Sequence, residues 1–301
     1  MSLFDQLVDE ALKNRRDLAP LRMVVEKELL HHDILRVLSH AGLLARLTFM
    51  GGTCLRACYG SSRLSEDLDF TGGADFNREN LSAMAQGLID SLMAKYGLEV
   101  EVSEPTREVG NVDTWKLKVQ TRPGRKDLPA QRINIDVCAV PSHQARPMVL
   151  LNPYGVEMGT SGLILQAESR EEIFADKLVA FALRPNRIKH RDLWDMAWLH
   201  QQGVKPHTDL VPVKLEDHRC AQPHFLQLLD ERRLSLQADP EVAAGFRQEM
   251  RRFLPADLVT QTVDQAAFWI YLTGLIDDLC AQTRQVLSKE NSGSTAVRFR
   301  M

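Results

Sequence analysis

The chain has 301 residues and a mass of 34.0 kDa, enough for two domains or one large domain. Its net charge of −3, from 37 basic and 40 acidic residues, excludes a polycationic nucleic-acid-binding protein but allows a local basic patch. The mean hydropathy is −0.23 and no apolar run approaches the roughly 20 residues that cross a bilayer, so we expect no association with a membrane.

The cysteines and the first residues indicate the compartment. Five cysteines, an odd number spread along the chain, do not form the pattern of a disulfide framework. Residues 1–10 hold three acidic groups and lack the basic start and apolar run of a signal peptide. We therefore expect a reduced, cytoplasmic protein.

The first 71 residues predict helices followed by two short strands. Residues 1–47 have an apolar repeat near 3.6 residues, with an interruption at Gly42. Residues 47–50 predict a strand, 51–53 a tight glycine turn, and 54–58 a short helix. Acidic and apolar residues alternate from Asp67 to Thr71, which indicates a strand with one buried face.

Another helix and two paired strands are expected before residue 140. The helix covers 77–95, and alternation predicts strands at 115–120 and 132–137. The loop at 122–127 contains proline and glycine, so the two strands should form an antiparallel pair.

The remainder of the chain predicts mainly helices. Residues 141–167 look irregular, and helices are expected at about 169–183, 190–202, 221–235, 240–254 and 260–288. We therefore predict an α+β fold, in which a small mixed or antiparallel sheet with flanking helices precedes a helical domain. The expected domains are residues 1–160 and 161–301.

Glycines and acidic residues in the first domain suggest one chemistry. Gly51 and Gly52 would let a ligand approach the backbone, and the following helix would present its N-terminus to phosphate. Asp67 and Asp69 are two apart on a strand, so both carboxylates project to one side and can hold a divalent cation. Asp136, between two apolar residues, would complete a set of three acids.

Simpler interpretations exist for each feature. The glycine turn alone is most often a tight loop, and the paired acids can belong to a solvated strand face. Asp136 can be an edge-strand acid that faces water. The combination favours a metal site that grips a triphosphate and activates an attacking hydroxyl.

The runs 49–60 and 63–70 closely resemble the AbiEii/AbiGii nucleotidyltransferase toxins of the polymerase-beta-like superfamily. The resemblance extends over about residues 26–200. It implies an Mg²⁺-dependent (or Mn²⁺-dependent) enzyme that transfers a nucleotide from an NTP, in some members to the acceptor end of tRNA. It also implies an antitoxin partner and a role in defence against phage.

The resemblance assigns roles to individual residues. Thr53 matches the phosphate-binding position, Asp67 and Asp69 match the metal-binding acids, and Asp136 matches the third acid. We place Ser65 with Gly51, Gly52 and Thr53 in the nucleotide-binding set.

The second domain should supply further charged groups. Lys177 matches the functional lysine of the family and would neutralise the triphosphate, although an arbitrary lysine more often lies along the surface. Arg184, Arg187, Lys189 and Arg191 would bind NTP phosphates or an RNA backbone, or form a solvated loop. Asp192 and Asp195 share a helix face, and one of them, with Asp195 slightly favoured, would act as general base.

Two other functions remain open from the sequence. The acceptor can be a protein hydroxyl instead of RNA. The chain can also be a nucleotide-binding module without catalytic turnover, which the intact Asp67 and Asp69 pair disfavours.

Overall fold

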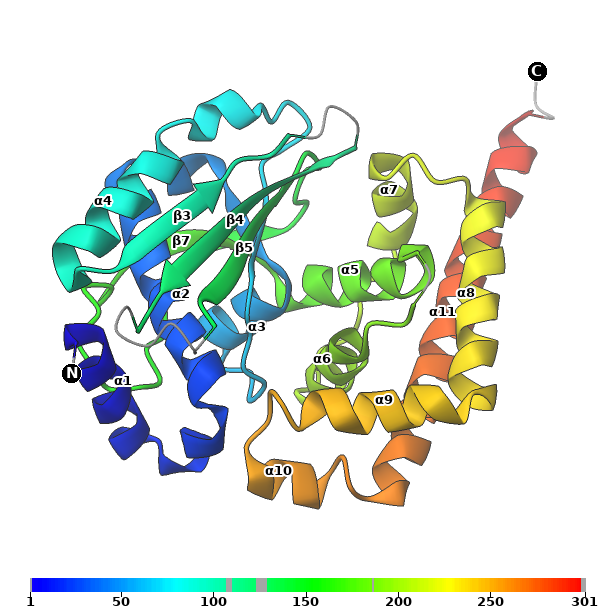
Figure 1. The fold of residues 1–301 in the computed structure, drawn as a ribbon. Helices are drawn as coiled ribbons and strands as arrows, with labels where there is room; N and C mark the ends of the chain where they lie inside the picture. Colours follow the sequence, from blue (N-terminus) through cyan, green and yellow to red (C-terminus); the bar gives the residue numbers. More distant parts are fainter. Residues whose placement is uncertain (1, 107–109, 123–128, 186, 299–301) are drawn as a thin grey trace. The chain divides into compact units, whose positions relative to one another are not determined.

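The structure is a computed structural model that describes residues 2–106, 110–122, 129–185 and 187–298, with side chains up to residue 289 (Figure 1). It divides into two compact units, Met1–Ser169 with Phe253–Ala256, and Arg170–Arg252 with Asp257–Met301. Of the loop predicted at 122–127, only Arg122 is among the described residues.

A mixed sheet of seven strands forms the centre of the first unit, in the order β3-β4-β5-β2-β1-β7-β6. The strands are β1 (Thr48–Met50), β2 (Leu68–Thr71), β3 (Glu99–Ser103), β4 (Val112–Gln120), β5 (Gln131–Cys138), β6 (Ala145–Val149) and β7 (Ile164–Glu168). β2 runs parallel to β5 and antiparallel to β1, while β4 and β5 form the predicted antiparallel pair. The sheet with its flanking helices confirms the predicted fold class.

The helices of the first unit are mostly those that the sequence predicts. They are α1 (Leu3–Asn14), η1 (Arg16–Leu21), α2 (Arg22–His40), η2 (Leu43–Arg46), α3 (Gly51–Tyr59), η3 (Arg78–Leu81) and α4 (Met84–Tyr96). α2 contacts β5, and α4 lies along β3 (Figure 1). The two helices are joined through the fully buried Asp33 of α2, which accepts hydrogen bonds from Lys95 and Tyr96 of α4, each at 2.7 Å.

The prediction that residues 141–167 are irregular is wrong in part. This segment contains β6 and β7, and β7 extends the sheet by pairing in parallel with β1. The prolines and glycines of this segment hid the two strands, because they lie in and around short pairings. Residues 161–169, assigned above to the helical domain, consequently belong to the first unit.

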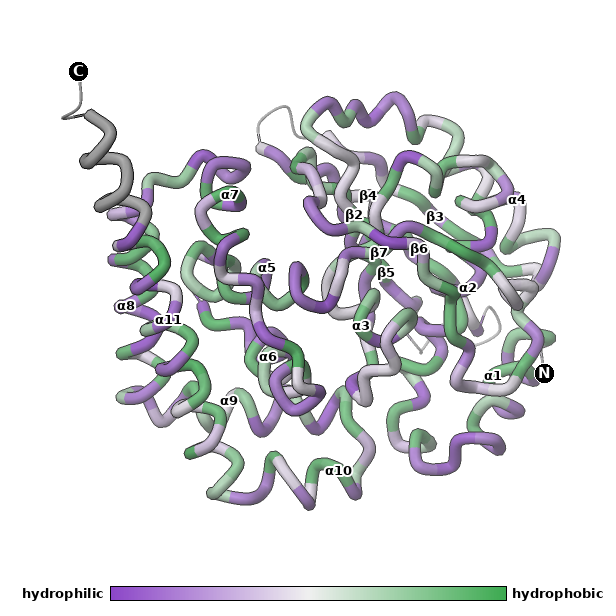
Figure 2. Tube along the Cα trace, turned by 180° about the vertical axis from the view of Figure 1, so that it is seen from behind, coloured by the Kyte–Doolittle hydropathy of each residue, from purple (hydrophilic) through white to green (hydrophobic). Residues whose placement is uncertain are grey.

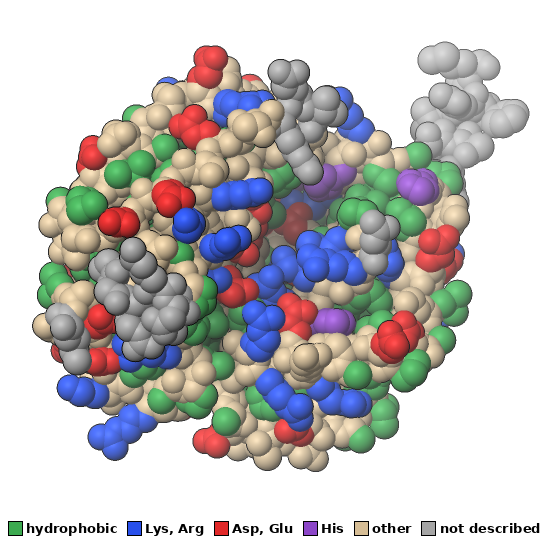
Figure 3. Space-filling model, in the orientation of Figure 1, with side chains coloured by type: hydrophobic (Ala, Val, Ile, Leu, Met, Phe, Trp, Pro, Cys, Tyr) green, Lys and Arg blue, Asp and Glu red, His purple; other side chains and the backbone are tan. Residues whose placement is uncertain are grey.

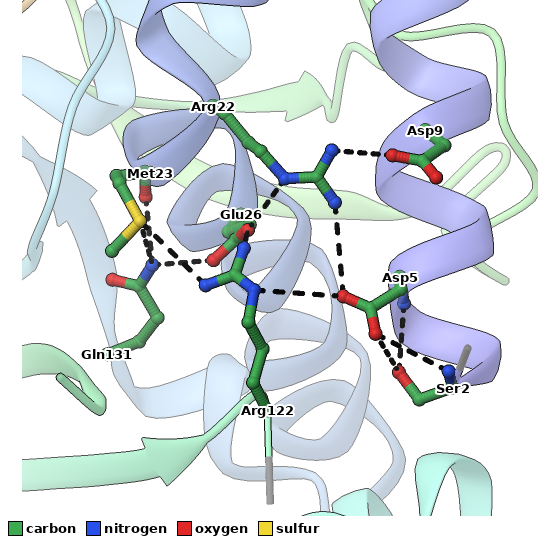
Figure 4. Close-up of polar contacts among 8 residues, drawn as sticks. All are labelled: Ser2, Asp5, Asp9, Arg22, Met23, Glu26, Arg122 and Gln131. Atoms are coloured by element: carbon green, nitrogen blue, oxygen red, sulfur yellow. Dashed lines mark hydrogen bonds and ion pairs between the residues drawn. The ribbon is translucent and has the colours of Figure 1, made fainter. Parts of the chain in front are cut away.

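A polar network around a buried carboxylate fixes α1 and α2 to the ends of β4 and β5 (Figure 4). At its centre is Glu26 of α2, whose side chain is 1% exposed. Its carboxylate pairs with Arg22 and Arg122 and accepts a hydrogen bond of 2.7 Å from Gln131. Arg22 in turn pairs with acidic residues of α1, so one carboxylate joins four elements.

The second unit is helical. Its helices are α5 (Arg170–Leu183), α6 (His190–Gln201), α7 (Leu210–Asp217), α8 (Gln222–Ala238), α9 (Pro240–Met250), α10 (Ala256–Gln261) and α11 (Ala266–Arg298). α8 contacts both α5 and α11, and Figure 2 shows hydrophobic and hydrophilic residues interspersed along α8 and α11. Trp194 and Trp198 of α6 are buried and belong to the core of this unit.

Two features of this unit differ from the prediction. α7 was not predicted, and the single helix expected at 260–288 is instead α10 and α11, separated at residues 262–265. Among the described residues, no helix has both the length and the apolar character needed to cross a bilayer.

We predict that Glu26→Ala lowers the free energy of unfolding by about 3 kcal/mol, because it leaves two arginines and an amide without their shared buried acceptor. The control is Asp17→Ala, which removes an ion pair whose side chains are 32% and 39% exposed and should cost less than about 1 kcal/mol. Urea unfolding of both variants measures the difference. Equal losses would contradict the central role of Glu26.

Candidate active site

The connection between β1 and α3 is a glycine turn in the left-handed region. Gly51 has φ +74°, and a Cβ atom at this position would lie 2.8 Å from Oδ2 of Asp69. Any other residue would therefore be strained and would also press on this carboxylate. The close approach explains the glycine and places the N-terminus of α3, which begins Gly51-Gly52-Thr53, beside Asp69.

The pairing of the central strands brings the predicted acids to one side of the sheet. Asp69 on β2 is in register with Asp136 on the parallel strand β5. Neighbouring residues in register project to the same face, about 5 Å apart across the sheet. The intervening Leu68, Phe70 and Ile135 are buried on the opposite face.

Asp67 lies just before β2 and is held in place by the backbone. Its Oδ1 accepts a hydrogen bond of 3.0 Å from the amide of Asn134 on β5. Its carbonyl oxygen accepts a short hydrogen bond from the hydroxyl of Thr53. The Thr53 and Ser65 hydroxyl oxygens are 2.6 Å apart, so the start of α3 and the segment before β2 are joined directly.

These residues fit a divalent cation. Asp67, Asp69 and Asp136 are half-buried and offer only carboxylate oxygens, the donors that Mg²⁺ and Mn²⁺ prefer. The space beside Asp69 is kept open by the missing side chain of Gly51. A metal ion that also contacts phosphate needs both the carboxylate ligands and this open space beside them.

A second charged cluster lies within the helical unit. Lys177 of α5 forms ion pairs with Asp192, at 2.5 Å, and with Asp195, at 3.0 Å, both on α6. Arg184 Nη2 also reaches Asp192, at 3.1 Å. The side chains of Lys177 and the two aspartates are at most 10% exposed. Lys177 is therefore a buried, ion-paired residue and not a surface lysine.

The pKa of Asp192 reflects two opposed effects. Burial alone would raise it, because a carboxylate in a poorly solvated site favours its neutral form. The charges of Lys177, Lys189 and Arg184 and the hydrogen bond from Lys177 outweigh burial, so the pKa lies well below its usual range. Asp192 is therefore ionised at neutral pH.

A pocket of about 370 Å³ opens between the start of α6 and the helices α8 and α9. Figure 3 shows Lys and Arg side chains gathered near the end of α5 and the start of α6. Glu249 of α9 pairs with His190 at 3.0 Å and with Arg191 at 3.2 Å. The side chains that line the pocket include Arg187, Lys189, Arg191 and Arg232, together with the imidazole of His190.

The structure gathers the predicted residues in two sets, one in each unit. The first unit brings together Gly51, Gly52, Thr53, Ser65, Asp67, Asp69 and Asp136. The second brings together Lys177, Arg184, Asp192 and Asp195, while Arg191 lines the pocket.

Several polar residues around these sets were missed by the sequence analysis. Glu28 accepts a hydrogen bond from the backbone amide of Ser65, and the backbone amide of Asn134 donates one to Asp67. Glu249 and Arg232 line the pocket. Only Glu28 gave a signal, as an acidic residue next to the apolar Leu29 and Leu30 on α2. The other three depend on pairings between distant parts of the chain.

Comparison with known proteins identifies the class. Residues 33–269 match the family model described as nucleotidyl transferase AbiEii toxin, type IV toxin–antitoxin system. This match covers most of the chain, so the protein belongs to the AbiEii family and is a nucleotidyltransferase of the toxin type. The resemblance proposed from the sequence is confirmed.

Solved structures that are similar to this chain include the following two. MenT4, a nucleotidyltransferase toxin from Mycobacterium tuberculosis, is 20% identical with a TM-score of 0.54, over 94% of this chain and 92% of MenT4. JHP933 from Helicobacter pylori is 15% identical with a TM-score of 0.47, over 89% of this chain and 98% of that one. Among curated protein sequences, no significant match was found. The MenT4 likeness supports the fold.

We predict that Gly51→Ala impairs nucleotidyl transfer strongly and also destabilises the first unit. The added Cβ must displace the Asp69 carboxylate, in addition to a backbone strain of about 1–2 kcal/mol. The control is Gly97→Ala, because Gly97 has a similar φ of +66° but nothing within 4 Å of the added atom. It should lose similar stability from strain yet retain activity, as measured by urea unfolding and a transfer assay. Full activity in Gly51→Ala would contradict the close approach.

We also predict a pH dependence from Asp192. Its pKa is lower in the folded protein than the unfolded value of 3.8, so its ion pairs stabilise the fold above that pH and are lost as the pH falls below it. Between about pH 5 and 2, the Asp192→Asn variant should therefore lose less thermal stability than the wild-type protein does. Asp257→Asn, at an exposed position of α10, serves as the control and should leave the profile unchanged. An unchanged profile in Asp192→Asn would contradict the assignment.

Proposed function

We propose that this protein is an Mg²⁺-dependent toxin that transfers a nucleoside monophosphate from an NTP to the acceptor end of tRNA. The observation that carries the proposal is the register of Asp69 with Asp136, next to Asp67 and the N-terminus of α3. Carboxylates beside a helix N-terminus can bind a metal-bound triphosphate. The cation binds both the carboxylates and the phosphates, which would otherwise repel each other, and the helix N-terminus favours the phosphate charge.

The first unit would bind the nucleotide. Asp67, Asp69 and Asp136 would hold Mg²⁺ or Mn²⁺, which when bound lowers the pKa of the attacking hydroxyl and stabilises the developing phosphate charge. The backbone amides at Gly52 and Thr53 would bind phosphate. The hydroxyls of Thr53 and Ser65 hold the segment before β2, so we assign them to shaping this site.

The second unit would supply charge and a base. Lys177 would neutralise the triphosphate. Asp192, which is engaged by Lys177 and Arg184, would hold these two cations in position. We assign Asp195, on the same face of α6, as the group that accepts the proton of the acceptor hydroxyl once its ion pair with Lys177 opens, because its side chain is 0% exposed in that pair.

The pocket of the helical unit supports a nucleic-acid acceptor. Arg187, Lys189, Arg191 and Arg232 place four fixed positive charges around it, in a chain whose overall charge is negative. Asp239, Glu241 and Glu249 also line it, so hydroxyl donors can bind beside phosphates. A ribose–phosphate chain has both kinds of group, which favours RNA over a protein hydroxyl.

The biological setting follows from the family. An antitoxin would restrain the protein, and growth arrest by a toxin of this type would serve defence against phage. All five cysteines are free, and three are buried, which supports a reducing compartment such as the cytoplasm.

The defining test is incubation with Mg²⁺, each labelled NTP in turn, and total tRNA. We expect label on tRNA with the wild-type protein and a loss of at least about a thousandfold in Asp69→Asn, because the metal ligand is removed. Unfolding of the variant is monitored in parallel. Equal labelling by Asp69→Asn would overturn the metal site, and label on protein alone would replace RNA with a protein hydroxyl as acceptor.

A further prediction concerns the pocket. The double variant Arg187→Gln/Arg232→Gln should raise the KM for tRNA by about tenfold and reduce the salt dependence of RNA binding, since two phosphate contacts are lost. The control Arg219→Gln/Arg247→Gln removes two exposed charges of the same unit that do not line the pocket. Identical KM values in the two double variants would remove the pocket from the acceptor site.

A further inference from the structure

The segment that precedes β2 is held by one face of α2. Ser65 donates its backbone amide to Oε1 of Glu28 at 2.8 Å. His31 Nε2 lies 3.0 Å from the carbonyl oxygen of Glu66, and Lys27 pairs with the Glu66 carboxylate at 2.8 Å. Three α2 side chains therefore fix two consecutive residues just before Asp67.

Glu28 is itself held rigidly. Its side chain is 6% exposed, and its Oε2 receives the Arg56 guanidinium at 3.1 Å and a short hydrogen bond from the hydroxyl of Tyr154. Arg56 also donates to the carbonyl of Ser61, at 2.8 Å. One carboxylate thus joins α2, α3, the segment before β2 and the loop before β7.

The connection continues from Glu28 to the acids. The Ser65 hydroxyl contacts the Thr53 hydroxyl, which donates to the carbonyl of Asp67. Asp67 is the only one of the three acids that lies outside a strand, since Asp69 and Asp136 are fixed by the pairing of β2 with β5. The sheet contacts the Asp67 carboxylate through the amide of Asn134 on β5, but strand pairing does not fix the Asp67 backbone.

We propose that Glu28 is a positioning residue for the metal site. It fixes the backbone of Ser65 so that the Asp67 carboxylate meets the ion held by Asp69 and Asp136. This inference rests on the proposed function of these acids. Glu28 does not touch the ion or the substrate; it acts through the amide of Ser65 and the hydrogen bonds that follow it.

Glu28→Gln tests this role, because the amide cannot accept from Ser65, Arg56 and Tyr154 as the carboxylate does. We expect the dissociation constant for Mn²⁺, measured by electron paramagnetic resonance of the free ion, to rise by about tenfold. The Mg²⁺ concentration for half-maximal transfer should rise in parallel, and kcat at saturating Mg²⁺ should change less.

Asp33→Asn is the matched control. Asp33 is also a buried carboxylate of α2 that binds a tyrosine hydroxyl and cationic side chains, but its Tyr96 and Lys95 partners are on α4. We expect comparable losses of thermal stability in the two variants and an altered Mn²⁺ affinity only in Glu28→Gln. Equal affinity shifts would show that Glu28 is merely structural and would overturn the proposal.

Two further variants separate the possible failures. Asp69→Asn should abolish Mn²⁺ binding; if it does not, the metal site of the proposed function fails, and the role of Glu28 with it. If Asp69→Asn abolishes binding while Glu28→Gln binds like wild type, only the positioning role is overturned. Should Glu28→Gln not fold, Tyr154→Phe removes one support of Glu28 and should weaken Mn²⁺ binding two- to threefold, whereas wild-type affinity would overturn the proposal.

Discussion

The parallel pairing of β2 with β5 is the constraint on which the proposed chemistry depends. It sets Asp69 beside Asp136 without any contact between the two side chains being required, because register alone determines which residues share a face. A shift of β2 by one residue would turn Asp69 into the core and Leu68 and Phe70 outward, while Asp136 kept its face. The buried Leu68, Phe70 and Ile135 therefore protect the position of the acids as well as the stability of the sheet.

Gly51 and Glu28 meet two different requirements of the site formed by the central strands. Negative carboxylates that lie close together repel, and a site for phosphate must also leave room for the ligand. The glycine provides room, since its backbone approaches Asp69 more closely than any side chain would permit. The α2 carboxylate fixes the irregular segment that carries Asp67, which lies before the paired residues of β2. The helical unit separately places a buried lysine between two aspartates, an arrangement that keeps its charge fixed away from bulk water.

Much of this organisation could be predicted from local sequence patterns. Local alternation and spacing predicted the strand that carries Asp69 and a glycine turn after β1. The strand begins at Leu68, however, so Asp67 lies before it, and α3 begins at Gly51 and not at residue 54. β6 and β7 could not be predicted, because short strands rich in proline and glycine neighbours carry little periodic signal. The role of Lys177 as a buried ion pair was also hidden, since its partners lie 15 and 18 residues further along the chain, on the next helix. The contact of Glu28 with Ser65 spans 37 residues, and only the folded backbone reveals it.

The central claim is that Asp67, Asp69 and Asp136 hold the divalent cation. The most direct test is the anomalous diffraction of Mn²⁺ in crystals of the protein grown with Mn²⁺ and a non-hydrolysable NTP analogue. We expect an anomalous peak in contact with carboxylate oxygens of Asp69 and Asp136 and with the analogue's phosphates, next to the N-terminus of α3. A peak bound only by acidic residues elsewhere, with the nucleotide away from α3, would contradict it.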